Sequence, residues 1–265
     1  MKTTTCYSYD EDLHTNESAK TIVEHVMRLL SPATVSDFGC GKGQFLKAFK
    51  EAGVEAVHGY DGPWAKDPSK ENLSEHEFSS VDFEHADFIH PEKTDLALSL
   101  EVAEHISTAS ARDFVHLLCK ASDVVVFSAA LPLQGGQGHI NEQPISYWSD
   151  LFTKEGYVPF DLLRRTLWNN DNVEVWYRQN ICIYVKMGTP HETRLIQATQ
   201  RYLHDCSADI ISLPRTIVHP EFFEMRIKEY EDRLNIIYEG GIKPTSYLYL
   251  CGKSIARKFK RGANE

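Results

Sequence analysis

The segment that constrains the fold most is "VSDFGCGKGQFLKAF", Val35 to Phe49, in which three glycines separate an apolar run from an amphipathic one. Glycine accepts backbone angles that other residues avoid, and it lets a ligand approach the main chain. Gly39, Gly41 and Gly43 therefore predict a tight turn that leads from a strand into a helix. A turn of this kind is typical of nucleotide-binding α/β domains.

The chain on either side of this turn alternates between strand-like and helix-like segments. We expect helices over about 15–32, 44–53, 110–120 and 145–155, and strands over 34–39, 54–62, 76–83, 94–102, 123–131, 161–168 and 173–186. This alternation predicts a doubly wound, mostly parallel sheet with helices on both faces. The last two strands are close in sequence, which suggests an antiparallel element at one edge.

The pattern changes after Gly188. Residues 190–205 and 220–240 are charged and helical in period, and no further strand alternation follows. We therefore divide the chain into an α/β domain, residues 1–188, and a C-terminal helical extension, residues 189–265. These helices are also the candidate interface for a homodimer.

Charge and cysteine content limit the partners and the compartment. The formal net charge of −10 argues against the phosphate backbone of a nucleic acid as a partner. A basic stretch at 253–261 is either a solvated helix end or a contact to an anionic surface. Six scattered cysteines indicate reduced thiols. There is no signal-peptide core and no apolar run of membrane-spanning length, so we predict a cytoplasmic protein without an integral membrane segment.

Two acids select the ligand of the glycine turn. Asp61 ends the second expected strand about 20 residues after the turn, where an acid can accept hydrogen bonds from both ribose hydroxyls. Asp37 stands just before the turn, and its carboxylate would repel a pyrophosphate but attract a cation. S-adenosylmethionine carries a sulfonium and an ammonium and no phosphate. The charge pattern therefore favours S-adenosylmethionine over a nicotinamide dinucleotide.

The segments "VSDFGCGKG", "GYDG" and "DLALSLEVAEHI" together resemble the cofactor motifs of class I S-adenosylmethionine-dependent methyltransferases, a resemblance that covers about residues 10–188. It implies a Rossmann-like seven-stranded sheet with the cofactor across the carboxyl ends of the strands. The cofactor-binding residues that it implies are Asp37, Gly39, Gly41, Gly43, Asp61, Asp82, Phe83 and Glu101.

The same resemblance assigns parts of the cofactor to these residues. Asp37 and Gly39 would flank the methionyl part, and Asp61 would bind the ribose. Asp82 and Phe83 would meet the adenine, although Asp87 is a rival to Asp82. Glu101 would lie beside the methionyl and sulfonium groups.

Methyl transfer to an alcohol releases a proton, and histidine, with a pKa of about 6.5, suits the base. Two of the twelve histidines lie where such a site opens: His105 after the fourth expected strand, and His139 on the glycine-rich loop after the fifth. His139 is the first candidate for the general base; it alternatively binds the acceptor or caps the next helix. His105 is the second candidate, or it packs beside the adenosine.

The segment "GGQGHINEQPISYWSDLF" is similar to one in methyltransferases of bacterial surface-polysaccharide (capsule) biosynthesis, where it borders the acceptor pocket. Asn141, Glu142, Tyr147 and Trp148 are therefore candidates for binding the acceptor, although the two aromatic side chains also suit the core. Glu104 either orients a histidine or is a helix-start acid. A divalent ion held by Glu104, His105, His139 and Glu142 is the weaker alternative, because no spacing demands one, and we predict no metal.

These patterns predict an S-adenosylmethionine-dependent O-methyltransferase with a histidine base, acting on a sugar, a nucleotide-linked sugar or another small polar surface-glycan precursor. One alternative is methyl transfer to nitrogen or to a phosphoryl oxygen of a capsule modification precursor. Another is a non-catalytic cofactor-binding module.

Overall fold

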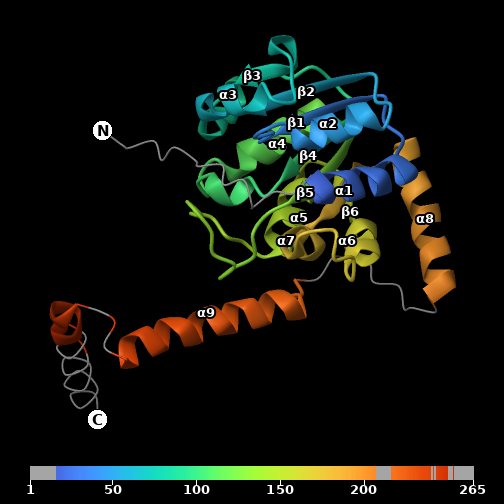
Figure 1. The fold of residues 1–265 in the computed structure, drawn as a ribbon. Helices are drawn as coiled ribbons and strands as arrows, with labels where there is room; N and C mark the ends of the chain where they lie inside the picture. The colour runs from blue at the N-terminus through green and yellow to red at the C-terminus, as the bar shows by residue number, and fades with distance from the viewer. Residues whose placement is uncertain (1–15, 207–215, 240, 242, 250–252, 254–265) are drawn as a thin grey trace. The chain divides into compact units, whose positions relative to one another are not determined.

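The structure is a computed structural model that describes residues 16–206, 216–239, 241, 243–249 and 253. Its centre is a seven-stranded sheet with the order β3-β2-β1-β4-β5-β7-β6 (Figure 1). The strands are β1 (Thr34–Phe38), β2 (Ala56–Asp61), β3 (Phe78–Ser80), β4 (Leu96–Leu100), β5 (Val124–Ser128), β6 (Tyr157–Phe160) and β7 (Cys182–Lys186). The first five strands run parallel, and β7 pairs antiparallel with both β5 and β6. The Rossmann-like, mostly parallel sheet that the sequence predicts is confirmed.

Helices precede, connect and follow these strands. The α-helices labelled in Figure 1 are α1 (Asn16–Leu29), α2 (Gln44–Glu51), α3 (Lys66–Ser69), α4 (Ala111–Ala121), α5 (Ile145–Lys154), α6 (Leu162–Leu167), α7 (Val175–Asn180), α8 (Pro190–Cys206) and α9 (Pro220–Tyr238), and residues 244–249 are helical as well. Short 3₁₀ turns are η1 (Pro63–Ala65), η2 (Glu75–Glu77), η3 (Phe83–Phe88) and η4 (Ala103–His105).

The central strands β4 and β5 are buried on both faces, as their nearly continuous apolar runs require. Alternate residues of β4 point to opposite sides, so Leu96 and Leu98 join a core with α1, α2 and α6, whereas Ala97 joins a core with α4 and α5. Trp148 and Phe152 of α5 are fully buried in this second core. The helices on both faces that the alternation predicts are confirmed.

The region after β6 differs from the sequence prediction. Residues 161–168 were expected to form a strand, but they contain helix α6, in which Leu162, Leu163 and Leu167 pack into the core. The Arg164 guanidinium donates to the Asp161 carboxylate at the start of this helix, 2.8 Å from Nε to Oδ1. The expected strand at 173–186 is divided into helix α7 and strand β7.

The strand that pairs with β7 is β6, which the sequence analysis missed. It has four residues, and Gly156, with φ of +83°, turns the chain from α5 into it. The Tyr157 hydroxyl, at its start, donates to the carbonyls of Cys119 and Ser122. The antiparallel edge is therefore correct, but its first strand lies earlier than predicted.

The chain divides by its contacts into two units, residues 1–219 and 220–265. In the first unit, α8 packs on β6 and β7, and Leu195 is fully buried there. The second unit contains α9. The last strand ends at Lys186, close to the predicted boundary after residue 188, and the treatment of 189–265 as one extension stays a prediction.

Among the described residues, no helix has the length and apolar character needed to cross a membrane. Cys40, Cys119 and Cys182 are free thiols, and burial raises the pKa of each above its usual range. Residues 254–261 of the basic stretch lie outside the described part of the chain.

Candidate active site

The glycine turn between β1 and α2 has the backbone that its sequence predicts. Gly39, Gly41 and Gly43 all have positive φ, at +97°, +52° and +75°. A Cβ on Gly39 would lie 2.2 Å from Val102 Cγ2, so this position needs glycine for its backbone angle and also for its close packing. The Gly39 N–H donates to the Tyr60 carbonyl at 2.7 Å, which fixes the turn against the end of β2.

A cavity of about 270 Å³ opens at the carboxyl ends of β1, β2 and β4, where open α/β sheets bind their ligands. The predicted site residues that line it are Asp37, Gly39, Gly41, Asp61, Asp82, Phe83, Glu101 and His105. Segments far apart in the sequence thus meet around one cavity. Those that do not line it are Gly43, His139, Asn141, Glu142, Tyr147 and Trp148.

Asp61 is held in place by backbone amides. Its Oδ2 accepts from the Gly41 N–H at 2.8 Å, and its Oδ1 accepts from the Gly62 N–H at 2.6 Å. The carboxylate therefore connects the end of β2 to the glycine turn, at the wall of the cavity.

Asp37 is buried and lines the cavity. Burial raises the pKa of this carboxyl well above its usual range, and the neighbouring charge of Asp61 raises it further. A cationic group bound beside Asp37 would lower that pKa again, because an opposite charge favours the ionised form. An anionic diphosphate would raise it still more. The electrostatics of the cavity therefore favour a cationic ligand.

Glu101 ends β4 with a positive φ of +55°, which is unusual for a residue with a side chain. Its carboxylate accepts from the Gln134 amide at 2.9 Å and from the Asn180 amide at 3.1 Å. Burial raises the pKa of Glu101 to about 7 despite these hydrogen bonds. Strained backbone of this kind concentrates at ligand sites, and here it directs a carboxyl group to the cavity.

Asp82 and Phe83 form the wall after β3. The Asp82 side chain accepts from the Glu84 N–H at 3.0 Å, and Phe83 packs against Phe114 with ring centroids 5.1 Å apart. Trp64 lines the cavity as well. The side chain of Asp87, the rival of Asp82, lies outside the described residues.

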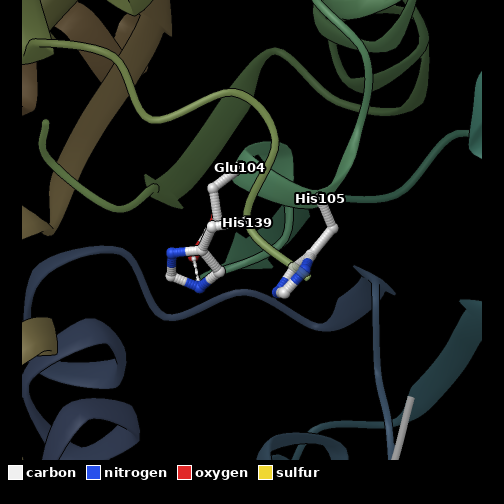
Figure 2. Close-up of side chains that lie close together, drawn as sticks. All are labelled: Glu104, His105 and His139. Atoms are coloured by element: carbon white, nitrogen blue, oxygen red, sulfur yellow. Dashed lines mark ion pairs between the residues drawn. The ribbon is translucent and has the colours of Figure 1, made fainter. Parts of the chain in front are cut away.

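The two predicted histidines meet beside the cavity. His105 is on its wall, and the ring centroids of His105 and His139 are 4.9 Å apart, edge to face (Figure 2). Glu104 points to the same place from η4, and its Oε1 lies 3.9 Å from His139 Nε2. The structure thus brings Glu104 and His105, which follow β4, next to His139, which lies on the loop after β5.

The loop between β5 and α5 holds His139 in a defined orientation. His139 Nδ1 lies 2.9 Å from Glu142 Oε1, and Glu142 Oε2 accepts from the Leu133 N–H at 2.8 Å. A Cβ on Gly136 would lie 2.2 Å from His139 Nε2, so glycine makes room for the ring. Glu142, predicted to bind the acceptor, contacts His139 in the structure.

The other predicted acceptor residues have structural contacts. Asn141 is buried, and its Oδ1 accepts from the Thr108 hydroxyl at 2.9 Å. Trp148 lies in the core with its ring centroid 5.4 Å from that of Phe127, and Tyr147 packs on Trp148. These positions fit the core packing that the sequence left open, and a role in acceptor binding stays a prediction.

Three residues that shape the site were not expected from the sequence. Trp64 lines the cavity, and Gln134 and Asn180 bind the carboxylate of Glu101. The dipeptide Gly62-Pro63 after Asp61 was a signal that the chain turns back toward the cavity there. Tyr177, which the aromatic residues of its segment made a candidate for the cleft, does line the cavity. Nothing in the local pattern indicated Asn180, because the segment that contains it reads as a strand.

No curated protein matches the chain. Among solved structures, DesVI of Streptomyces venezuelae shares 13% identity, with a TM-score of 0.50 over 64% of this chain and 91% of its own. An O-methyltransferase family protein from Burkholderia thailandensis shares 11%, with a TM-score of 0.45 over 64% of this chain. The match spans little more than half of that protein, 58%.

A magnesium protoporphyrin IX methyltransferase from Synechocystis, with bound S-adenosylmethionine, shares 16% identity, with a TM-score of 0.45 over 64% of this chain and 80% of its own. The family model described as "Methyltransferase domain" matches residues 10–160, more than half of the chain and all of the cofactor motifs. S-adenosylmethionine is the cofactor that this domain implies, in agreement with the glycine turn and its acids. The chain therefore belongs to the methyltransferase domain family.

Proposed function

We propose that the protein transfers a methyl group from S-adenosylmethionine to an oxygen of a small polar acceptor. One observation carries the proposal: a single cavity has the glycine turn and the acids Asp37, Asp61 and Glu101 on one side, and His105, in contact with His139, on the other. The glycine turn and the three acids suit a cationic nucleoside. The two histidines suit an acceptor group that has to lose a proton.

The reaction is an in-line displacement, so the protein has to align the sulfur, the methyl carbon and the acceptor oxygen. The O–H bond of the acceptor breaks and its proton passes to an imidazole. The O–CH₃ bond forms while the C–S bond breaks, and its electron pair stays on the sulfur. His105 faces the cavity, and His139 supports it from behind with its ring oriented by Glu142. The two histidines together are our candidates for the base.

A sugar or a nucleotide-linked sugar of surface-glycan (capsule) biosynthesis is the proposed acceptor. This part rests on the resemblance of the segment at 135–152 and on the hydroxyl-rich nature of such acceptors. The net charge of −10 agrees with a small molecule rather than a nucleic acid. The cytoplasmic location and a homodimer through the C-terminal helices are part of the same proposal.

The test is a transfer assay with methyl-labelled S-adenosylmethionine and a panel of nucleotide sugars. We expect the label in an ether, and a fall in turnover of about 100-fold or more in His105→Asn and His139→Gln. His116→Gln is the matched control, because His116 also pairs with a carboxylate, 2.8 Å from Glu155, on the outer part of α4. Calorimetry with S-adenosylhomocysteine checks that each variant still binds the cofactor.

Three results would contradict the proposal. Label in an amine would show nitrogen transfer, and full turnover in both variants would remove the histidines from the reaction. Cofactor binding without turnover on any acceptor would favour a non-catalytic module.

A further inference from the structure

Glu104 is the most unusual charge in the described part of the chain. Its side chain is fully buried, and neither carboxylate oxygen makes a hydrogen bond of normal geometry to a described residue. The backbone N–H groups of Glu104 and Ala130 lower the pKa of this carboxyl group, but burial outweighs them. A buried ionised carboxylate without a partner is costly, so such groups are normally paired, protonated or bound to a metal. Glu101 and Glu142 add negative charge nearby, which makes the lack of a cation more costly.

The two imidazoles complete a set of metal ligands around Glu104. One ligand atom each from Glu104, His105 and His139 lie within 4.8 Å of one another, and His139 Nε2 is 3.9 Å from Glu104 Oε1 (Figure 2). Ligands at roughly 2.1 Å from one ion lie about 3 Å apart in adjacent positions and about 4.2 Å apart in opposite ones. Small side-chain rotations therefore bring all three atoms to one ion.

The surroundings of His139 have the arrangement that metal-binding histidines have. Such a histidine usually donates its other ring N–H to a carboxylate, which fixes the tautomer and directs the free lone pair to the ion. With Glu142 2.9 Å from Nδ1, His139 presents Nε2 toward Glu104. The lack of a side chain on Gly136 leaves the room for this ring position.

We propose that Glu104, His105 and His139 bind one divalent first-row transition-metal ion at the acceptor side of the cavity. Two imidazoles and one carboxylate suit ions such as Mn²⁺, Co²⁺ and Zn²⁺ better than Mg²⁺, which prefers oxygen ligands. Three protein ligands leave coordination positions open, and His105 lies on the cavity wall. An acceptor oxygen in the cavity can take one of those positions. The sequence analysis predicted no metal, and this proposal departs from that prediction.

The inference rests on the proposed function and deepens it. Oxygen remains the acceptor, but an imidazole that binds an ion cannot take a proton. In the metal-loaded protein the ion lowers the pKa of the bound hydroxyl, whose proton passes to water, and the oxygen then attacks the methyl carbon as before. In the metal-free protein, an imidazole accepts the proton of the acceptor hydroxyl. The ion also neutralises the charge of Glu104.

The test measures metal binding directly. Protein dialysed against a chelator is titrated with Mn²⁺, followed by the loss of the free-ion electron paramagnetic resonance signal, and with Co²⁺, followed by its visible absorption. We expect one ion per chain, weak competition by Mg²⁺, and no binding in Glu104→Gln or His139→Gln. Glu142→Gln should weaken the affinity about 10–100-fold, because it removes only the group that orients His139.

His116→Gln is the matched control, and it should bind metal as the unmodified protein does. Circular dichroism shows whether each variant is folded, and if Glu104→Gln or His139→Gln is unfolded, Glu142→Gln and the Mg²⁺ competition decide. Absence of stoichiometric Mn²⁺ and Co²⁺ binding would overturn the inference. Binding that is unchanged in all the site variants would overturn it too.

The two proposals fail in different ways. Methyl transfer that persists in a chelator, in protein that binds no metal, leaves the proposed function intact and refutes the metal site. Metal binding that depends on Glu104 and His139, without methyl transfer to any oxygen acceptor, supports the metal site and refutes the proposed function.

Discussion

The close packing of Gly39 against Val102 allows a quantitative test of the glycine turn. A Cβ on Gly39 would lie 2.2 Å from Val102 Cγ2 and 2.9 Å from Cγ1, and φ is +97°. Gly53 is a matched control, because its φ is +94° and a Cβ there would meet nothing within 4 Å. Gly→Ala should therefore cost stability at both positions because φ is positive. At Gly39 it should cost more, because the new Cβ also collides with Val102.

The backbone cost of positive φ is about 1–2 kcal/mol, and overpacking adds about 1–3 kcal/mol. We expect Gly53→Ala to lower the free energy of unfolding by about 1–2 kcal/mol and Gly39→Ala by about 2–5 kcal/mol. Val102→Ala removes both colliding methyl groups. In the Gly39→Ala/Val102→Ala double variant, the loss of these methyl groups should therefore restore most of the stability that the collision costs. The expected coupling free energy between the two positions is about 1–3 kcal/mol.

The assay is urea unfolding followed by circular dichroism, together with calorimetric titration of S-adenosylhomocysteine. Only Gly39→Ala should weaken cofactor binding, since Gly53 closes helix α2 far from the cavity lining. Equal losses of stability in the two alanine variants would refute the argument. So would a coupling below about 0.5 kcal/mol between positions 39 and 102.

Three further predictions concern buried groups. Burial raises the pKa of Glu101 to about 7, so affinity for S-adenosylmethionine should fall below pH 7, by up to tenfold per pH unit through Glu101 alone. In calorimetry, Glu101→Gln should weaken this dependence without removing it, because the pKa of Asp37 in the same cavity is raised as well. A flat profile for the unmodified protein would contradict this prediction. Burial also raises the pKa of Glu104 well above its usual range. In metal-free protein this group therefore stabilises the fold at low pH, and the contribution is lost as pH rises through the folded-state pKa. The melting temperature of Glu104→Gln should fall less between pH 5 and 8 than that of the unmodified protein, and parallel curves would contradict this. Trp148→Ala should cost about 3–5 kcal/mol in urea unfolding because the ring is buried against Phe127, and a loss below 1 kcal/mol would place the ring outside the core.

The parallel half of the sheet was predictable because its strands have a simple physical signature. A strand buried on both faces is apolar throughout, as in β4 and β5, and glycine is the residue that the turn after β1 requires. Helix α6 was not predictable in this way. Its Leu-Leu-Arg-Arg-Thr-Leu sequence is too short to show a helical period, and the ion pair of Arg164 with Asp161 is visible only in three dimensions.

The candidate site was predictable only where its residues follow strand ends. Asp37, Asp61 and Glu101 meet because parallel strands end at one edge of the sheet. His105 and His139 also follow strands, but no pattern showed that their rings touch. Trp148 looked suitable for a sugar, yet its position on α5 faces the sheet, and local sequence does not distinguish an aromatic residue of the core from one of a cleft.

The central claim is that the cavity at the strand ends binds a cationic nucleoside rather than a dinucleotide. Calorimetric titration of the unmodified protein and of Asp61→Ala with S-adenosylmethionine and with NADH tests it most directly. We expect one S-adenosylmethionine site per chain, at least tenfold weaker in Asp61→Ala, and no heat with NADH. Binding of NADH that S-adenosylmethionine does not displace, or no binding of S-adenosylmethionine at all, would contradict the claim.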